Sequence, residues 1–193
     1  MIHNKIYDVM KEFLSDYNKQ VYGRGLIGKV DMSPKGIALI LNKLEKEKIL
    51  ISKKRAGVKY FSLNKKNVLI KRYIIVMEII NSIKFLERNL KFKHIIDKLI
   101  KPSQIVCIFG SYAKGNQKRK SDIDLFIVGD FNEKQIKEIN EEYKIKISVK
   151  NTSKSNFIKS IKENNPLINE ILTNHILLSG YDEFVREVIK QKW

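Results

Sequence analysis

The residues whose types and spacing point most directly to chemistry are Gly110-Ser111 and, after ten intervening residues, Asp122-Ile123-Asp124. Residues two apart on a strand project from the same face, so the two carboxylates lie together while Ile123 points into the core. Adjacent carboxylates repel each other, and a hard divalent cation neutralises both. A turn at Gly110-Ser111 that opens a short helix offers backbone N–H groups to an anion. A metal site beside a phosphate site is typical of an enzyme that handles nucleotides.

The elements that must position these residues form a small α/β unit. Apolar patterns predict strands at 104–109 and 122–128, one on each side of the Gly-Ser turn, and a third strand at 143–149. The helices expected around these strands cover residues 91–100, 133–142, 155–162 and 166–174. The predicted fold class is therefore α/β (α+β), with a mixed sheet flanked by helices.

The N-terminal part of the chain has a different organisation. Apolar spacing predicts one helix near residues 2–17 and a short glycine-containing helix at 22–28. A third helix is expected to begin at Ser33-Pro34, because serine is a preferred N-cap and proline at the first helical position loses no hydrogen bond. The strand patterns 49–54 and 58–63 then flank a glycine-containing turn and predict a β-hairpin.

A long helical pattern at residues 64–90 joins the two parts. Its apolar stripe is wide, so we expect it to pack either against the two domains or against a second copy of the chain in a homodimer. The predicted organisation is a first domain at residues 1–64, linker helices at 65–100 and a second domain at 101–193.

The composition narrows the class of protein. The net charge of +17 makes a polyanionic partner a serious candidate, although a lysine-rich coding bias gives the same excess. Cys107 is the only cysteine, which excludes an internal disulfide and fits a cytoplasmic location. No apolar run is long enough for a membrane span, so we expect no membrane partner.

The passage from Met32 to Asn64 resembles the winged helix-turn-helix family along its whole length. In that family the second of the paired helices enters the DNA major groove and a basic hairpin contacts the backbone. The resemblance implies groove contacts from one helix and phosphate contacts from the hairpin, the candidate DNA-binding residues being Lys35, Asn42, Lys43, Lys53, Lys54, Arg55 and Lys59. The alternative use of such a domain is dimerisation or domain packing.

The spacing of Gly110-Ser111 and Asp122-Ile123-Asp124 resembles the signature of the DNA polymerase beta-like nucleotidyltransferase superfamily. The chain looks most like the minimal nucleotidyltransferases of prokaryotes, which include the antitoxin partners of HEPN toxins, and the likeness covers about residues 104–180. It implies that Gly110 and Ser111 bind the β- and γ-phosphates of a nucleotide. It also implies that Asp122 and Asp124 are catalytic and coordinate Mg²⁺.

Two lysines complete the expected nucleotide site. Lys114 follows the Gly-Ser turn and would steer a polyphosphate, and Lys146 would offset phosphate charge. The family normally supplies a third carboxylate from a following strand, but here the outward positions of residues 143–150 hold Lys144, Lys146, Ser148 and Lys150. Full two-metal chemistry is therefore in question.

Three explanations of the missing acid stay open. One metal ion suffices for slow transfer, or the site binds a nucleotide without turning it over, or a glutamate from another element completes it, the candidates being Glu141, Glu142 and Glu170. The close pair Asp122/Asp124 favours retained activity, because an inactive site has little chemical reason to keep two adjacent acids.

The sequence leads to one main functional hypothesis and two alternatives. The first is an Mg²⁺-dependent nucleotidyltransferase that transfers a nucleotide, for example AMP, from an NTP to a protein or RNA acceptor. The second is a winged-helix transcriptional regulator whose nucleotidyltransferase-like domain binds a nucleotide or a partner without catalysis. The third is an enzyme that modifies RNA ends. The partners implied are DNA or RNA, an NTP and a toxin protein.

Overall fold

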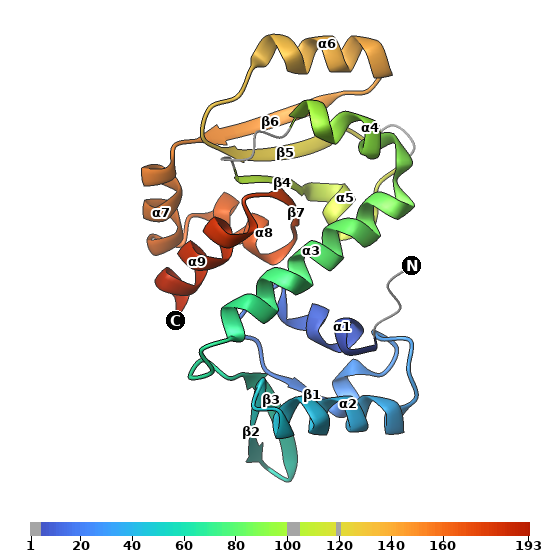
Figure 1. Ribbon diagram of the computed structural model, residues 1–193, viewed down its shortest axis with the longest axis vertical. Coiled ribbons are helices and arrows are strands. Elements are labelled where there is room, and N and C mark those ends of the chain that lie inside the picture. The colour runs from blue at the N-terminus through green and yellow to red at the C-terminus, as the bar shows by residue number, and fades with distance from the viewer. Residues whose placement is uncertain (1–4, 100–104, 119–120) are drawn as a thin grey trace. The chain divides into compact units, whose positions relative to one another are not determined.

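The computed structural model of the chain describes residues 5–99, 105–118 and 121–193. The chain divides into two units, Met1–Ile80 with Trp193, and Asn81–Lys192. Helix α3 (Ile70–Arg88) contributes residues to both units, and Figure 1 shows it in green. None of the helices in the described ranges combines the length and apolar character needed to cross a membrane.

The first unit contains short helices and a three-stranded antiparallel sheet. The strand order is β1-β3-β2, so the last strand of the hairpin lies in the middle. In chain order, the elements before α3 are α1 (Lys5–Met10), η1 (Lys11–Phe13), β1 (Val21–Tyr22), η2 (Gly23–Leu26), α2 (Pro34–Lys46), β2 (Leu50–Arg55) and β3 (Val58–Leu63).

Local sequence signals explain the two best-defined elements of this unit. Helix α2 begins as expected, with Pro34 at its first position and the Ser33 hydroxyl accepting a hydrogen bond from Gly36 N at 3.2 Å. The hairpin turns at Ala56 and Gly57, which both have positive φ values, +46° and +77°. A two-residue turn with this backbone matches the twist of the strands that it joins.

The second unit is built on a four-stranded mixed sheet of order β6-β5-β4-β7. β4 pairs antiparallel with β5 and β7, whereas β5 and β6 are parallel. Its elements after α3 are α4 (Leu90–Leu99), β4 (Ile105–Phe109), α5 (Gly110–Lys114), β5 (Ile123–Val128), α6 (Glu133–Tyr143), β6 (Ile147–Thr152), α7 (Lys154–Lys162), α8 (Pro166–Thr173), β7 (Ile176–Ser179) and α9 (Tyr181–Lys192).

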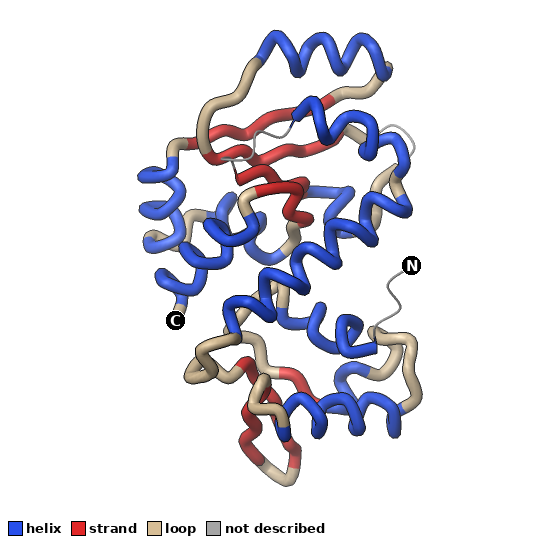
Figure 2. The backbone as a smooth tube through the Cα atoms, in the orientation of Figure 1, coloured by secondary structure: helices blue, strands red, loops and turns tan. Residues whose placement is uncertain are grey.

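Both faces of this sheet are covered, so its central strands are buried on both sides, as Figure 2 allows the reader to follow. On one face Ile108 and Leu125 belong to a core that includes Phe92 of α4 and Ile139 of α6. On the other face Phe126 packs against α7 and α9 through aromatic contacts, the ring series being Phe126, Phe157 and Phe184.

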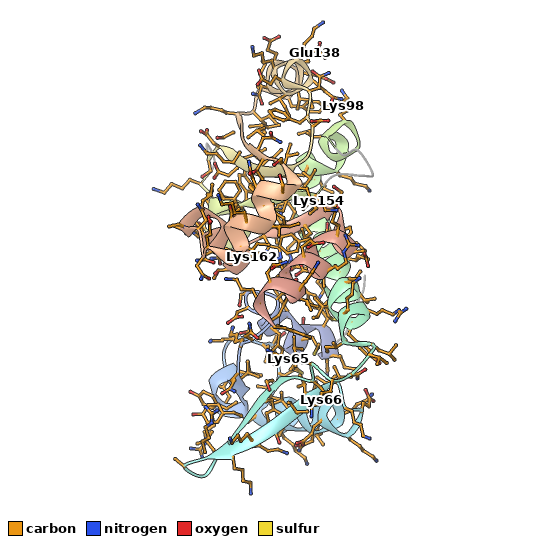
Figure 3. The ribbon with its side chains drawn as sticks, turned by 90° about the vertical axis from the view of Figure 1, so that its left-hand side faces the viewer. Lys65, Lys66, Lys98, Glu138, Lys154 and Lys162 are labelled. Atoms are coloured by element: carbon orange, nitrogen blue, oxygen red, sulfur yellow. The ribbon has the colours of Figure 1, made fainter. Side chains whose placement is uncertain are left out.

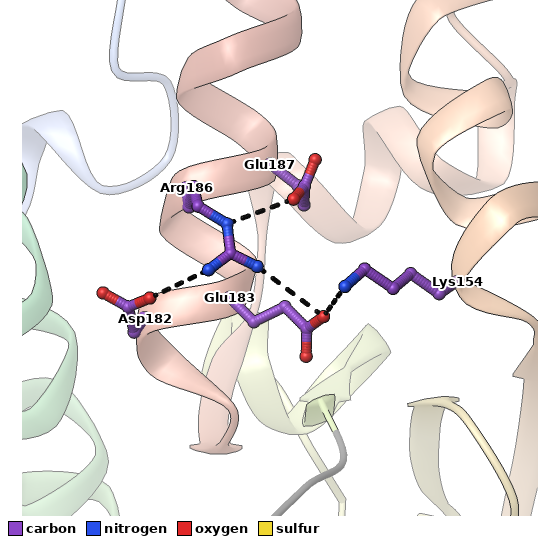
Figure 4. A network of polar contacts seen from close by, with 5 residues as sticks. All are labelled: Lys154, Asp182, Glu183, Arg186 and Glu187. Atoms are coloured by element: carbon purple, nitrogen blue, oxygen red, sulfur yellow. Dashed lines mark hydrogen bonds and ion pairs between the residues drawn. The ribbon is translucent and has the colours of Figure 1, made fainter.

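Charged side chains also join α7 to α9 (Figure 4). The Arg186 guanidinium contacts Asp182, Glu183 and Glu187 of its own helix. Lys154 at the start of α7 bonds Glu183 Oε1 at 2.5 Å. The network fixes the two helices at the face of the sheet that carries Phe126.

The structure differs from the sequence-based expectations at several elements. The first predicted helix consists, in its described part, of α1 and the 3₁₀ helix η1, and α9 was not predicted. The glycine-containing segment is a short 3₁₀ helix, η2, and the long helix α3 begins at Ile70, six residues later than predicted. Strand β7 was not predicted. The third predicted strand, 143–149, was placed too early, because Lys144 ends α6 in the left-handed conformation (φ +48°) and β6 begins only at Ile147. Gln104 and Ile100, predicted ends of elements, lie outside the described residues.

Candidate functional site

The site is centred on a close approach between Gly110 and Asp124. In the antiparallel pairing of β4 and β5, Phe109 is the partner of Asp124, and Gly110 follows it with a φ of +66°. A Cβ atom at Gly110 would overlap Asp124 Oδ2. The left-handed backbone and the close carboxylate therefore both favour glycine at this position.

Asp124 is half-buried and is the second residue of β5, while Asp122 immediately precedes the strand. Burial raises the pKa of Asp124, and the negative charges of Asp122 and Glu170 raise it further. Lys150 and Lys146 act in the opposite direction. Two negative and two positive side chains are thus close enough to the Asp124 carboxylate to affect its ionisation.

Lysine side chains pair with two of these acids. Lys146 Nζ donates to Asp122 Oδ2 at 2.6 Å, and this bond raises the pKa of Lys146. The backbone holds the pair together, since Ile123 N donates to the carbonyl oxygen of Lys146 at 2.8 Å. Lys114, at the end of α5, donates to Glu170 Oε1 at 2.7 Å.

Polar and aromatic contacts hold the described residues that follow the glycine turn and those that precede the acidic pair. The carbonyl oxygen of Ser111 accepts from Asn116 N at 3.1 Å, and the Tyr112 ring lies 5.1 Å from that of Phe92. At the other end, the Ser121 hydroxyl accepts a hydrogen bond from Lys118 N at 2.8 Å. Ser121 therefore bonds the backbone of Lys118, three residues earlier in the chain.

Residues 90–184 match the family described as Polymerase beta, Nucleotidyltransferase, a range that contains all of these residues. This segment is a polymerase beta-like nucleotidyltransferase domain. No curated protein and no solved structure matches the chain.

The acidic pair of the nucleotidyltransferase domain fits one divalent cation. Two carboxylates that act on each other supply hard oxygen ligands, and the absence of a side chain at Gly110 leaves room for the Asp124 carboxylate beside the backbone. A second ion would need another acid nearby. Within the described ranges, no three histidine, cysteine or acidic side chains come together as a metal site.

The three glutamates considered as a third acid have different positions. Glu142 bonds Lys98 at 2.7 Å, and Glu141 is exposed on α6. Glu170 is close enough to raise the pKa of Asp124, but its own carboxylate is held by Lys114. Of the three, Glu170 alone is part of the site's electrostatics.

The structure brings the sequence-predicted residues of the domain into two adjoining groups. Gly110, Asp122 and Asp124 form the first with Lys146, while Lys114 belongs to the second with Glu170. Sequence reasoning left out Lys150 as a site residue. The sequence feature that could have identified Lys150 is the two-residue alternation of β6. It places Lys150 on the same face as Ser148, the partner of Asp124.

In the first unit, the candidate nucleic-acid residues lie on α2 and the hairpin. Lys35, Asn42 and Lys43 are exposed on α2, and Lys43 also approaches Glu47 at 3.9 Å. The exposed end of β2 carries three further cations in succession, Lys53, Lys54 and Arg55.

Lys59 differs from the other hairpin cations because it is half-buried. Its ammonium group donates to Glu45 Oε2 at 2.6 Å and lies 4.9 Å from the centre of the Phe61 ring. Hydrogen bonds from Lys59 and from the Ser52 hydroxyl lower the pKa of Glu45. Lys59 therefore joins the hairpin to α2, and a phosphate contact from it would require this pair to open.

Alanine at Gly110 should disturb nucleotide binding far more than alanine at Gly115. Both glycines have a left-handed backbone, so each substitution costs roughly 1–2 kcal/mol of strain. At Gly115, however, a new Cβ meets nothing within 4 Å, whereas at Gly110 it collides with Asp124. We expect Gly110→Ala to weaken binding of Mg²⁺ and a non-hydrolysable ATP analogue by roughly tenfold or more, about 1.4 kcal/mol, in titration calorimetry. Equal affinities of the two variants would contradict this account of the glycine.

Asp124→Asn should raise the thermal unfolding midpoint of this unit at pH 7. The folded-state pKa of Asp124 is above its ordinary value, so its stabilising contribution is present at low pH and is lost as the pH rises through the folded pKa. Asparagine carries no such penalty, and the advantage of the variant should therefore disappear as the pH falls below about 4. Calorimetric scans between pH 7 and pH 3.5 measure the effect.

Asp122→Asn is the matched control for this measurement. This substitution removes the carboxylate that pairs with Lys146, so the thermal unfolding midpoint at pH 7 should stay unchanged or fall. A lower midpoint for Asp124→Asn at pH 7 would show that burial and like charges do not dominate at that residue.

Proposed function

We propose that the chain is an Mg²⁺-dependent nucleotidyltransferase that transfers a nucleotide, for example AMP, from an NTP to a protein or RNA acceptor. The observation that carries the proposal is the bare backbone of Gly110 against Asp124, with Asp122 close enough to raise the pKa of Asp124. The cations around this pair, Lys114, Lys146 and Lys150, suit a polyphosphate ligand.

In the proposed reaction the acceptor oxygen forms a bond to the α-phosphorus of the NTP. The bond from that phosphorus to the oxygen bridging the β-phosphate breaks, pyrophosphate leaves with the electron pair, and the acceptor's proton passes to water. Bound Mg²⁺ would neutralise charge on the phosphate oxygens. Asp122 and Asp124 would hold the ion, and Gly110-Ser111 and Lys114 would receive the β- and γ-phosphates.

Incubation with Mg²⁺ and an NTP labelled at the α-phosphorus tests the enzymatic proposal. We expect label on a protein or RNA acceptor, and a loss of at least ~100-fold with Asp122→Asn and Asp124→Asn combined, because the charge neutralisation that they support is worth several kcal/mol. Lys134→Ala, at an exposed position of α6, serves as the control. Undiminished transfer by the double variant would contradict the assignment, and no transfer to any acceptor would favour the non-catalytic alternative.

We further propose that the first unit is a winged helix-turn-helix that binds DNA. The support is its element order, in which α2 precedes a hairpin and the sheet has the order β1-β3-β2. Exposed cations lie on α2 and at the hairpin end, so one surface helix and one basic hairpin are available to a duplex. Lysines occur on both units, as Figure 3 shows for Lys65 and Lys154, so the charge excess alone does not locate the nucleic acid.

Removal of the hairpin cations should reduce both DNA affinity and its dependence on salt. Each phosphate contact contributes about 0.9 to the slope of log K against log [salt]. Alanine at Lys53, Lys54 and Arg55 should therefore lower the slope by about 2–3, measured by fluorescence anisotropy with a duplex. A triple variant of Lys134, Lys137 and Lys162 removes the same charge from the outer surface of the second unit. Equal slopes for the two triple variants would contradict the role of the hairpin.

The same experiments separate the alternatives. A regulator whose nucleotidyltransferase-like domain binds a nucleotide or a toxin protein would bind DNA without transferring label. An RNA-end-modifying enzyme would prefer RNA in the anisotropy measurement. We also propose that the chain forms a homodimer. Exposed apolar side chains before and on α3, among them Val68 and Val76, support this proposal. Sedimentation measures the oligomeric state.

A further inference from the structure

The strand beside the acidic pair carries no acid at the positions that face it. β5 and β6 are parallel, and their register pairs Ile123 with Ile147, Asp124 with Ser148, and Phe126 with Lys150. Paired residues of neighbouring strands project from the same face. Asp124 therefore has a hydroxyl as its direct neighbour, and the next position on that face is a lysine.

Lys146, which directly precedes β6, is also a cation and not an acid. Lys146 is held beside Asp122 by the backbone bond from Ile123 N to its carbonyl oxygen, and its ammonium group lies 2.6 Å from Asp122 Oδ2. Lys150 lies two residues beyond Ser148 on β6, on the same face of the sheet as Asp124. The β6 side of the acidic pair is thus already supplied with positive charge.

Among the described residues, one further acid acts on Asp124, and it comes from a helix that follows β6 in the chain. Glu170 belongs to α8 and is engaged by Lys114 at 2.7 Å. Among the residues that the structure describes, Glu170 does not join Asp122 and Asp124 in a three-acid metal site. A second divalent cation would have to compete with Lys146 for Asp122, and it would meet Lys150 without a further carboxylate to offset the repulsion.

We propose that this site takes a single divalent cation with each bound nucleoside triphosphate, and that Lys146 and Lys150 supply the positive charge of a second ion. The inference rests on the proposed nucleotidyltransferase function and deepens it. Lys146 would release Asp122 to the cation, and its ammonium group would then be available to the triphosphate. Neutralisation of the polyphosphate is therefore shared between one metal ion and the lysines of β6.

The number of bound ions tests the proposal without a measurement of activity. The full chain is saturated with a non-hydrolysable ATP analogue, and bound Mn²⁺ is counted by electron paramagnetic resonance. We expect one Mn²⁺ per bound nucleotide in the wild type. Ser148→Asp places a carboxylate directly beside Asp124 and should raise the number to two, while the uncharged Ser148→Asn should keep it at one. Lys146→Glu provides a second carboxylate variant if Ser148→Asp does not fold.

The outcomes distinguish the inference from the function on which it rests. Two Mn²⁺ ions with each nucleotide on the wild type would overturn the inference and leave the proposed function standing. No retention of the nucleotide at any Mn²⁺ concentration would overturn both. One ion in the wild type and in both folded carboxylate variants would overturn the claim that β6 limits the count.

Discussion

The nucleotidyltransferase domain depends on one steric constraint, the contact of the Gly110 backbone with the Asp124 carboxylate. The constraint follows from strand register. Phe109, the last residue of β4, pairs with Asp124, so the next residue, Gly110, lies beside the Asp124 carboxylate. A Cβ atom at Gly110 would force the Asp124 carboxylate to move, and the same residue turns the chain into α5 through a left-handed backbone. Gly110 thus directly follows β4, begins α5 and lies against a carboxylate oxygen of Asp124.

The sheet explains why the acids lie where they do. From Leu125 to Val128, β5 is buried on both faces, so a carboxylate in that stretch would lose its water without compensation. Asp124 is near the beginning of the strand and is half-buried, and Asp122 precedes the strand altogether. The start of β5 is therefore the one part of this strand where charge is tolerated, and it adjoins the end of β4 because the two strands are antiparallel.

Much of this arrangement was accessible from the sequence because its signals are local. The Gly-Ser turn, the Asp-Ile-Asp alternation, the Ser33-Pro34 helix start and the hairpin around Gly57 each depend on a few consecutive residues. The errors came from longer-range choices. The strand predicted at 143–149 begins only at Ile147. The Ile145 N–H bonds the Asn140 carbonyl, and the Asn140 side chain accepts from Ile147 N, so residues 144–146 form the turn that leads from α6 to β6. The pairing of Lys114 with Glu170 joins residues 56 positions apart, and no sequence pattern specifies it.

The lysines of the two units differ in a way that bears on what each binds. At the hairpin end, Lys53, Lys54 and Arg55 are exposed and form no ion pair among the described residues, so they offer charge to any polyanion. Lys114 and Lys146 are already paired with acids.

Partly exposed pairs of this kind are worth at most about 1 kcal/mol, so a ligand opens them at small cost. The acids then left behind need a cation of their own. A triphosphate that arrives with a metal ion satisfies both partners of each pair, whereas a bare phosphate backbone satisfies only the lysines. The paired lysines therefore favour a metal–nucleotide complex over nucleic acid at this site.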